Sequence, residues 1–472
     1  MSLASRRETI ALGFFLVSLS LLVITANAYE WSPNLSRFAF EYGNIGAALA
    51  QGRGFSDPFA LGTGATAWMP PFYCWFLGLL FAIFGVKSSG SIAALMACKI
   101  LGLSLGAGLL MASARRLRGE VASLSLLGMT WLAILGHRNW LTRQIFDHWL
   151  VMLLSCLILY ALVVGRPRII ALTGFVSPLI SPNLALGFGL AALFHWKGDR
   201  KRQGLLWSGM LISAGLWCLR NGLVLGVPYP IKSNAGYEFY QANAWARGRL
   251  SNATLTRYHP SQPNTSSSRH YQRVGERAFC QHYARLSQQL WQEDPLQMLG
   301  YIARRSWDVA VYVPRSDNLF LSKPDLEAGD KRILHQRKWI LAKPISQIWL
   351  IVDESEPEVR NRLEGLALAD VERAMQSWKS GMRWIDRAES HWEQRCKSLM
   401  TGLLPCLAVL YGLFKYREAM VPWAILYTGY MIPYIVISHY DRYQLSALML
   451  QVWLVWLAFY PSPLRPRTRT QE

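Results

Sequence analysis

The sequence predicts an all-α protein that crosses a membrane about ten times and carries a small, mixed or mainly helical domain outside the membrane. Of its 472 residues, 52% are hydrophobic, and 20 Trp, 20 Tyr and 19 Phe accompany apolar runs that recur along the chain. This composition is typical of a protein with several membrane spans. The formal net charge of +20 would also suit nucleic-acid binding, but many basic residues form tight clusters between the apolar runs, as in cytoplasmic loops. We therefore interpret the charge as a sign of topology and expect membrane lipids, not nucleic acid, as partners.

Apolar runs divide the chain into candidate spans. The run 9–28 begins and ends like a signal peptide, but it is long enough to span and is interpreted as an uncleaved anchor. The run Pro70 to Gly85 would reach only about 22 Å as a helix, short of the roughly 30 Å hydrocarbon core, so we expect it to lie along the interface or to re-enter. The predicted spans are 9–28, 89–112, 120–137, 147–165, 168–181, 183–196, 204–222, 397–415, 418–438 and 443–460.

The basic clusters orient these spans. With both termini in the cytoplasm and 70–85 kept on the outer face, every tight basic cluster in a short loop or tail lies inside. This assignment treats 168–196 as two short crossings around a break at Ser181, Pro182 and Asn183. The clusters are Arg6/Arg7, Arg115/Arg116/Arg118, Arg166/Arg168, Lys197/Arg200/Lys201/Arg202, Lys415/Arg417 and the tail from Arg465 to Arg469.

Three parts follow from this topology. They are a transmembrane module over 1–222 with its first outer loop at 30–88, an outer domain over 223–396, and a three-span module with a basic tail over 397–472. The outer domain is long enough for its own core. Its stretch from His259 to Arg269, rich in Ser, Asn, Gln and Pro, predicts a mobile loop. Cys280 and Cys396 flank much of the domain, and whether they pair stays open, with free thiols favoured by spacing alone.

The stretch from Ser32 to Gly85 reads as an amphipathic helix, a Gly-rich loop and a short apolar helix. Ser32 and Pro33 suit a helix start, and Gly52 and Gly54 suit its end. One predicted face is apolar, so a carboxylate at Glu41 would face away from lipid. The apolar face is Leu35, Phe38, Tyr42, Ile45 and Leu49, and the polar face is Arg37, Glu41 and Asn44.

A series of short motifs runs through most of the chain. They are Glu41–Ala47, Gly52–Phe55, Asp57–Phe59, Thr66–Pro71, Arg220–Asn221, Pro230–Gly236, Gly275–Glu276, Asp294–Pro295 and Tyr440–Tyr443. In this order they resemble bacterial relatives of glycosyltransferase family 39, a group of GT-C fold enzymes that includes protein O-mannosyltransferases and lipid A aminoarabinose transferases. The resemblance implies an inverting hexosyl- or pentosyltransferase of a bacterial inner (plasma) membrane. Its donor would be a polyprenyl-phosphate sugar and its acceptor, on the extracytoplasmic face, a glycan, lipid or protein.

The resemblance makes Glu41 the candidate general base, because the family carries an acidic residue at this place in the loop. A carboxylate within hydrogen-bond reach can take the proton of an attacking hydroxyl. The alternative is an ion pair with Arg37 one helical turn earlier. Asp57 would supply a second carboxylate at the substrate site, and its alternative role is to cap the turn before Pro58.

A second set of candidates lies near span ends. Similar GT-C enzymes carry an acidic residue after their third span that lines the sugar site, and Asp147 takes this place here. Its alternative role is an interfacial ion pair with Arg143, itself a candidate substrate contact. For the leaving phosphate, a guanidinium or ammonium group would stabilise the growing charge. The candidates are Arg442 first, then Arg220 and Lys232.

Other roles stay open at this stage. Arg220 would otherwise be a snorkelling anchor, and Asn183 either binds sugar or caps the broken helix. Tyr237, Tyr240 and Trp245 suit stacking on sugar but also suit a domain core. The chemistry requires no cofactor and leaves a divalent cation open. The alternative function is a transporter or flippase of lipid-linked saccharides, which predicts internal repeats with matched broken helices.

Overall fold

The computed structural model describes residues 40–310 and 399–459, apart from short gaps, together with residues 13, 14, 17 and 18. The gaps are 138–140, 142–145, 249, 251–253, 255–257, 263–264 and 440. The predicted span 9–28 therefore lies almost entirely outside the described residues. Arg143 and Cys396 also lie outside them, as does the rest of the predicted outer domain after residue 310.

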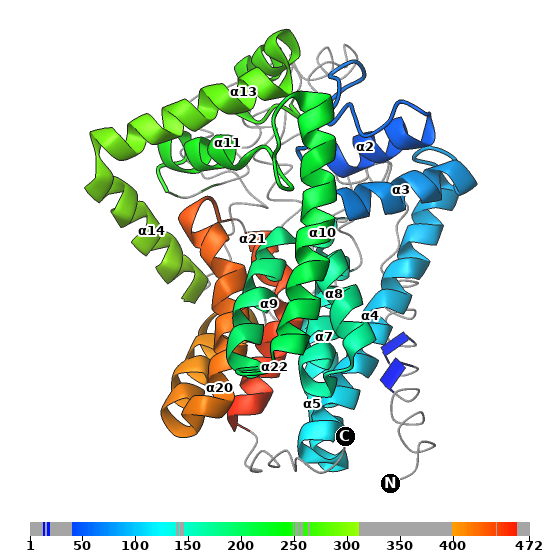
Figure 1. Ribbon diagram of the computed structural model, residues 1–472, viewed down its shortest axis with the longest axis vertical. Helices are drawn as coiled ribbons and strands as arrows, with labels where there is room; N and C mark the ends of the chain where they lie inside the picture. Colours follow the sequence, from blue (N-terminus) through cyan, green and yellow to red (C-terminus); the bar gives the residue numbers. More distant parts are fainter. Residues whose placement is uncertain are drawn as a thin grey trace, which may run out of the picture.

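The described part of the chain is helical throughout. It holds 14 α-helices and two short π-helical segments, and it contains no β-strand (Figure 1). The closest feature to a strand within these residues is an isolated antiparallel bridge between Ser56 and Ala65. This confirms the predicted all-α class.

Three helices are long and apolar enough to cross a membrane, which supports the prediction of a membrane protein. They are α4 (Ser89–Arg118), α10 (Arg200–Leu225) and the segment Thr401–Val436, most of which is α20 (Leu404–Val436). Along α10, leucine side chains stay exposed, including Leu216, Leu219 and Leu223. A long helix that exposes leucines is suited to contact lipid.

The count of ten spans is not what the structure shows, because the remaining apolar helices are short. They are α3 (Pro71–Phe84), α5 (Glu120–Gly136), α7 (His148–Val164), α8 (Pro167–Ile180), α9 (Pro182–His195) and α22 (Leu448–Phe459). A helix of 14 residues extends about 21 Å, less than the roughly 30 Å of hydrocarbon. Most of these helices have nearly the bounds predicted for their apolar runs, but they are too short to count as candidate spans by length and composition.

The boundary between α8 and α9 shows how a helix is shortened. Ser181 has an extended backbone that ends α8, and Pro182 occupies the first position of α9. The Ser181 hydroxyl accepts a hydrogen bond from the Leu184 amide at 3.4 Å. This confirms the predicted break. It also gives the capping role to Ser181, where the sequence had left it open for Asn183.

Helix α20 consists of two helices joined at Tyr416, whose backbone is not helical. A Cβ added to Gly412 would lie 2.8 Å from the side chain of Met420. Residues eight apart in a straight helix are separated by about 12 Å, so the chain must turn back at this point. This agrees with the predicted division into 397–415 and 418–438.

The helices form a bundle with a layer at one end, shown in the upper part of Figure 1. The layer contains α2 (Glu41–Ala50), α3, α11 (Ala235–Tyr240), α13 (Ser266–Glu293) and α14 (Pro295–Ala310). Arg305 of α14 is buried and donates hydrogen bonds to the carbonyls of Ile435 and Val436 at the end of α20. These bonds tie the layer to the bundle, because they satisfy carbonyls that a helix end leaves without partners.

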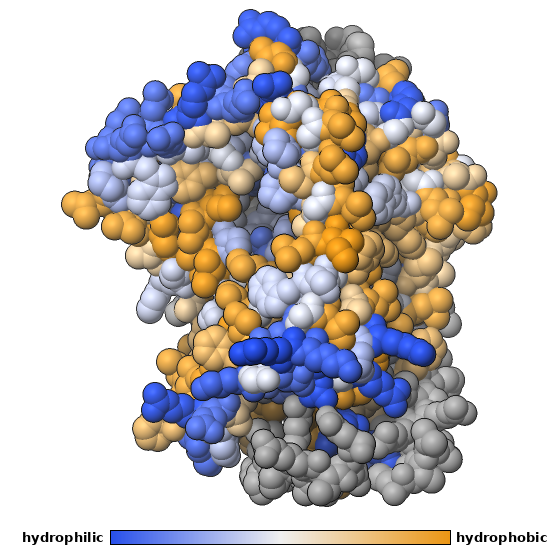
Figure 2. Space-filling model, in the orientation of Figure 1, coloured by the Kyte–Doolittle hydropathy of each residue, from blue (hydrophilic) through white to orange (hydrophobic). Residues whose placement is uncertain are grey.

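The surface in Figure 2 shows an apolar belt between two hydrophilic zones. The upper zone lies over α13, and the lower zone lies near the opposite end of the bundle. Within the bundle, α9 and α20 approach closely, since a Cβ added to Gly429 would lie 2.7 Å from the Cα of Gly187. Small residues at such crossings allow close packing between helices in a membrane.

Candidate functional site

Glu41 is the first residue of α2 and is buried, with 7% of its surface exposed. The preceding residue, Phe40, has φ of 51° and is not helical, so α2 begins at Glu41. The predicted helix start at Ser32 and the predicted ion-pair partner Arg37 lie outside the described residues. A carboxylate in the first turn of a helix is stabilised by the unpaired amide groups of that end.

Asp147 meets the same end of α2 from another part of the chain. The residue precedes α7, and its Oδ2 accepts a hydrogen bond of 2.7 Å from the Tyr42 hydroxyl. The thiol of Cys74, on α3, interacts electrostatically with both Asp147 and Glu41. Both carboxylates that the sequence assigned to catalysis therefore lie near Cys74, at the first turn of α2.

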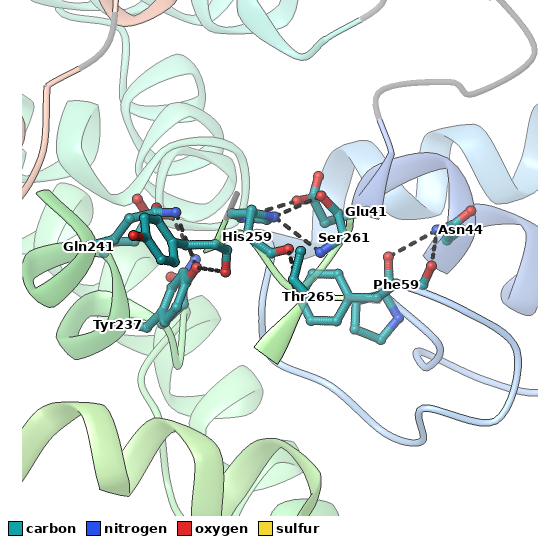
Figure 3. Close-up of polar contacts among 12 residues, drawn as sticks. Glu41, Asn44, Phe59, Tyr237, Gln241, His259, Ser261 and Thr265 are labelled. Atoms are coloured by element: carbon teal, nitrogen blue, oxygen red, sulfur yellow. Dashed lines mark hydrogen bonds and ion pairs between the residues drawn. The ribbon is translucent and has the colours of Figure 1, made fainter. Parts of the chain in front are cut away.

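A third group, His259, reaches this site from the polar stretch predicted to be a mobile loop. That prediction is wrong for its second part, because α13 begins at Ser266 and Thr265 caps it. His259 itself is 9% exposed, and its Nε2 lies 3.6 Å from Glu41 Oε1 (Figure 3). The sequence predicted no role for His259, because the polar residues around it are typical of an exposed loop and do not indicate a buried imidazole.

Aromatic rings surround His259 in the end layer. The rings of Phe59, Trp68 and Tyr237 lie at centroid distances of 5.9, 6.2 and 5.9 Å from the imidazole. Tyr237 is fully buried, and Trp245 stacks on Tyr258 at 4.5 Å. The tyrosines and tryptophan that would have suited sugar stacking therefore pack with other aromatic side chains.

Glu276 is a second buried carboxylate in the layer, and the sequence analysis assigned it no role. Its oxygens accept hydrogen bonds from the Ala67 amide and from three hydroxyl groups, those of Thr66, Ser233 and Tyr271. Gly275, with φ of 74°, kinks α13 just before it. Burial raises the pKa of the Glu276 carboxyl, and these hydrogen bonds oppose that shift. Glu276 therefore joins the loop between α2 and α3 to α13 and to Ser233.

The Asp57 carboxylate binds other residues of its own loop. One carboxylate oxygen accepts hydrogen bonds from the Gly62 and Gly64 amides at 3.1 and 3.0 Å, and the other lies 3.0 Å from Arg53 Nε. Gly62 and Gly64 both have positive φ, which suits a tight loop around the carboxylate. These contacts give Asp57 the loop-holding role that the sequence left open.

Arg220 lies at the other end of α2 from the carboxylates. Its guanidinium donates to the carbonyls of Thr66 and Phe55 at 2.6 and 2.9 Å, and it lies over the rings of Phe55 and Trp217. A cavity of about 780 Å³ opens here. Besides Arg220, its lining includes Leu49, Arg53, Asp57, Trp75 and Trp217. Leu49 is eight residues from Glu41, about 12 Å along the axis of α2, so Arg220 is not brought to the carboxylates.

The remaining candidates are placed as follows. Lys232 is half-buried and forms no hydrogen bond or ion pair with the described residues. Asn183 is the second residue of α9, and its side chain likewise forms no hydrogen bond within the described part of the chain. Arg442 belongs to α21 (Asp441–Ser446), and its side chain, like the whole of Arg143, is outside the description.

Comparison of the chain with protein families, curated proteins and solved structures finds no match. Within the described residues, no group of three or more His, Cys, Asp or Glu side chains is placed to hold a metal ion. The site holds two carboxylates and a histidine, which are groups suited to proton transfer.

Proposed function

We propose that the chain is a membrane glycosyltransferase that moves a sugar from a polyprenyl-phosphate donor to an acceptor hydroxyl on the extracytoplasmic face. The observation that carries this proposal is that Glu41 and Asp147 both lie near Cys74, and that Asp147 accepts a hydrogen bond from Tyr42, the residue after Glu41. Ionisable groups beside apolar helices of a membrane protein are costly and mark functional sites by default. The resemblance of the first loop to GT-C enzymes supports the same reaction.

In the proposed reaction, Glu41 accepts the proton of the acceptor hydroxyl while its oxygen attacks the anomeric carbon. The bond from that carbon to the phosphate oxygen breaks, and its electron pair leaves with polyprenyl phosphate. One displacement inverts the anomeric carbon. Asp147, within reach of the same site, is proposed to bind the sugar and to stabilise the positive charge that develops at this carbon.

The phosphate ligand is proposed to come from α21 rather than α10. Helix α21 packs against α7, the helix that Asp147 precedes, and it carries Arg442. Arg220 lies beyond Leu49, at the far end of α2, and its guanidinium is engaged by backbone carbonyls. A single sugar cannot bridge such a separation, so Arg442 is the first candidate and Lys232 the second.

The membrane topology is part of the proposal. Ten crossings, with both termini cytoplasmic, require 9–28, α4, α10 and both halves of α20 to cross together with the short helices α5, α7, α8, α9 and α22. A phosphatase reporter active only outside the cytoplasm is expected to be active when fused at Ser88 or Asn139 and inactive at Leu117. Activity at Leu117, or its loss at Asn139, contradicts ten crossings.

Glu41→Gln is expected to lower sugar transfer by about 10²- to 10⁴-fold, because general base catalysis contributes that much. The assay follows the release of polyprenyl phosphate by purified protein given polyprenyl-phosphate hexoses and pentoses and membrane extract as acceptor. Glu120→Gln is a matched control, since Glu120 is also the first residue of a helix but has 53% of its side chain exposed.

Two results would contradict the proposal. Full transfer by Glu41→Gln would remove Glu41 as the base. Movement of the lipid-linked sugar across vesicles without release of polyprenyl phosphate would instead establish the alternative, a flippase of lipid-linked saccharides.

A further inference from the structure

The protonation of His259 can be deduced from its neighbour Ser261. The Ser261 backbone amide donates a hydrogen bond of 3.2 Å to His259 Nδ1, and the Ser261 hydroxyl lies 2.7 Å from the same nitrogen (Figure 3). A backbone amide is only a donor, so Nδ1 must accept. In a neutral imidazole the proton then lies on Nε2, the nitrogen that faces Glu41.

The orientation of the ring is fixed as well as its proton. The His259 carbonyl accepts a hydrogen bond from Thr265, the cap of α13. Asn44 of α2 donates to the carbonyls of Pro58 and Phe59, which holds the Phe59 ring against His259. The imidazole is therefore held by contacts with both α13 and α2, the helix that begins with Glu41.

We propose that His259 is a positioning residue for Glu41, whose Nε2–H is directed at the carboxylate and keeps it ionised. This proposal rests on the proposed role of Glu41 as the base. The present separation of 3.6 Å exceeds an ordinary N–H···O bond, and such contacts often shorten when substrate binds. A donor directed at a carboxylate favours its charged form, which is the form a general base needs.

Other titratable groups also face Glu41, and they must stay unchanged in a test. Cys74 of α3 and Tyr237 of α11 interact with it electrostatically. Asp147 lies close through Tyr42 and also acts on Cys74. Substitutions at His259 leave these three in place, so a change in the protonation of Glu41 can be assigned to the imidazole.

The test measures the protonation of Glu41 directly. A hydrophobic carbodiimide reacts with protonated carboxyl groups and not with ionised ones, and mass spectrometry of the Glu41 peptide follows the reaction against pH in the purified full-length protein. His259→Leu and His259→Asn both lose the donor at Nε2, so the pH of half-labelling is expected to rise by about one unit. His259→Gln keeps an amide donor near that position and is expected to remain close to the unsubstituted protein.

A control and a contradicting result follow. His282→Leu removes a histidine of α13 whose ring packs on His270 at 5.0 Å, and it is expected to change nothing at Glu41. Equal half-labelling in all the His259 variants and the unsubstituted protein would overturn the proposal, as would a shift in His259→Gln as large as in His259→Asn. The Asn and Gln variants keep a polar side chain, so the comparison survives if His259→Leu fails to fold.

The labelling needs neither donor nor acceptor, which separates this inference from the proposed function. If labelling shifts as expected but Glu41→Gln still transfers sugar, the coupling of His259 to Glu41 stands and the role of Glu41 as base fails. If Glu41→Gln is inactive but labelling is unchanged in the His259 variants, the role of Glu41 as base stands and the coupling of His259 to Glu41 fails.

Discussion

Glu41 and Glu276 are both buried carboxylates in the layer at the end of the bundle, with 7% and 3% of their surface exposed. Their neighbours differ in kind. Glu276 accepts four hydrogen bonds from hydroxyl and amide groups. Glu41 faces the imidazole of His259, a group that can gain or lose a proton near neutral pH, whereas both carboxylates have a thiol and a phenol near them.

The difference separates a structural carboxylate from a reactive one. The donors to Glu276 come from the first loop, from Ser233 and from Tyr271, so one side chain fixes three segments. Donors such as hydroxyls and amides hold a carboxylate in place but do not exchange protons with it near neutral pH. Burial alone would have treated the two residues alike. The chemical nature of the neighbours is what distinguishes them.

The largest expected effect is on stability, from Glu276→Ala. This change leaves four buried donors without an acceptor, each at a cost of about 1–3 kcal/mol, so we expect a total loss of at least about 4 kcal/mol. Thermal unfolding of the purified protein in detergent measures it. Glu41→Gln, in contrast, is expected to unfold near the temperature of the unsubstituted protein while losing transfer.

Glu293→Ala is the control for this prediction, because Glu293 ends the same helix and is exposed. If Glu276→Ala unfolds at the same temperature as Glu293→Ala, the hydrogen bonds to Glu276 do not hold the layer together. If Glu41→Gln is the more destabilised variant, the contrast between the two carboxylates is reversed.

Much of the fold followed from local sequence features. Apolar content predicted the all-α membrane class, and the long spans at α4 and α10 lie near 89–112 and 204–222 as expected. The Ser181–Pro182 break was predictable because proline suits only the first turn of a helix. The bounds of the short helices were also close to those predicted, since α8 (Pro167–Ile180) matches 168–181 and α9 (Pro182–His195) matches 183–196. Their length of 14 residues does not by itself decide whether they cross a membrane.

The site was predictable only in part. Glu41 and Asp147 were found through a resemblance between motifs, but their proximity depends on a contact between residues 105 positions apart. His259 meets Glu41 from still farther along the chain, and Glu276 meets Thr66 across 210 positions. Periodicity within a helix carries no information about such pairs. The sequence did contain one local signal for this part of the site. His259 stands six residues before Thr265, a residue suited to cap the helix that follows.

A smaller effect is expected on the pH dependence of stability. Burial is the main cause that raises the pKa of Glu276 above 4.5, so the folded state holds this proton more tightly than the unfolded state. Stability from this group is fully present below about pH 4.5 and is lost as the pH rises through the raised folded pKa. The slope for one proton is at most about 1.4 kcal/mol per pH unit.

Glu276→Gln removes this proton but keeps an oxygen acceptor, so it isolates the pH effect from the loss of hydrogen bonds. The measured quantity is the difference in unfolding temperature between the unsubstituted protein and Glu276→Gln. This difference is expected to fall as the pH rises from about 4.5 through the folded pKa of Glu276. The same difference taken with Glu293→Gln is expected to show no such fall, because Glu293 is exposed. A difference that is constant with pH for Glu276→Gln would mean that its hydrogen bonds offset burial completely. Glu276 would then titrate at the same pH in the folded and unfolded states, and its contrast with Glu41 would rest on the hydrogen bonds that hold it.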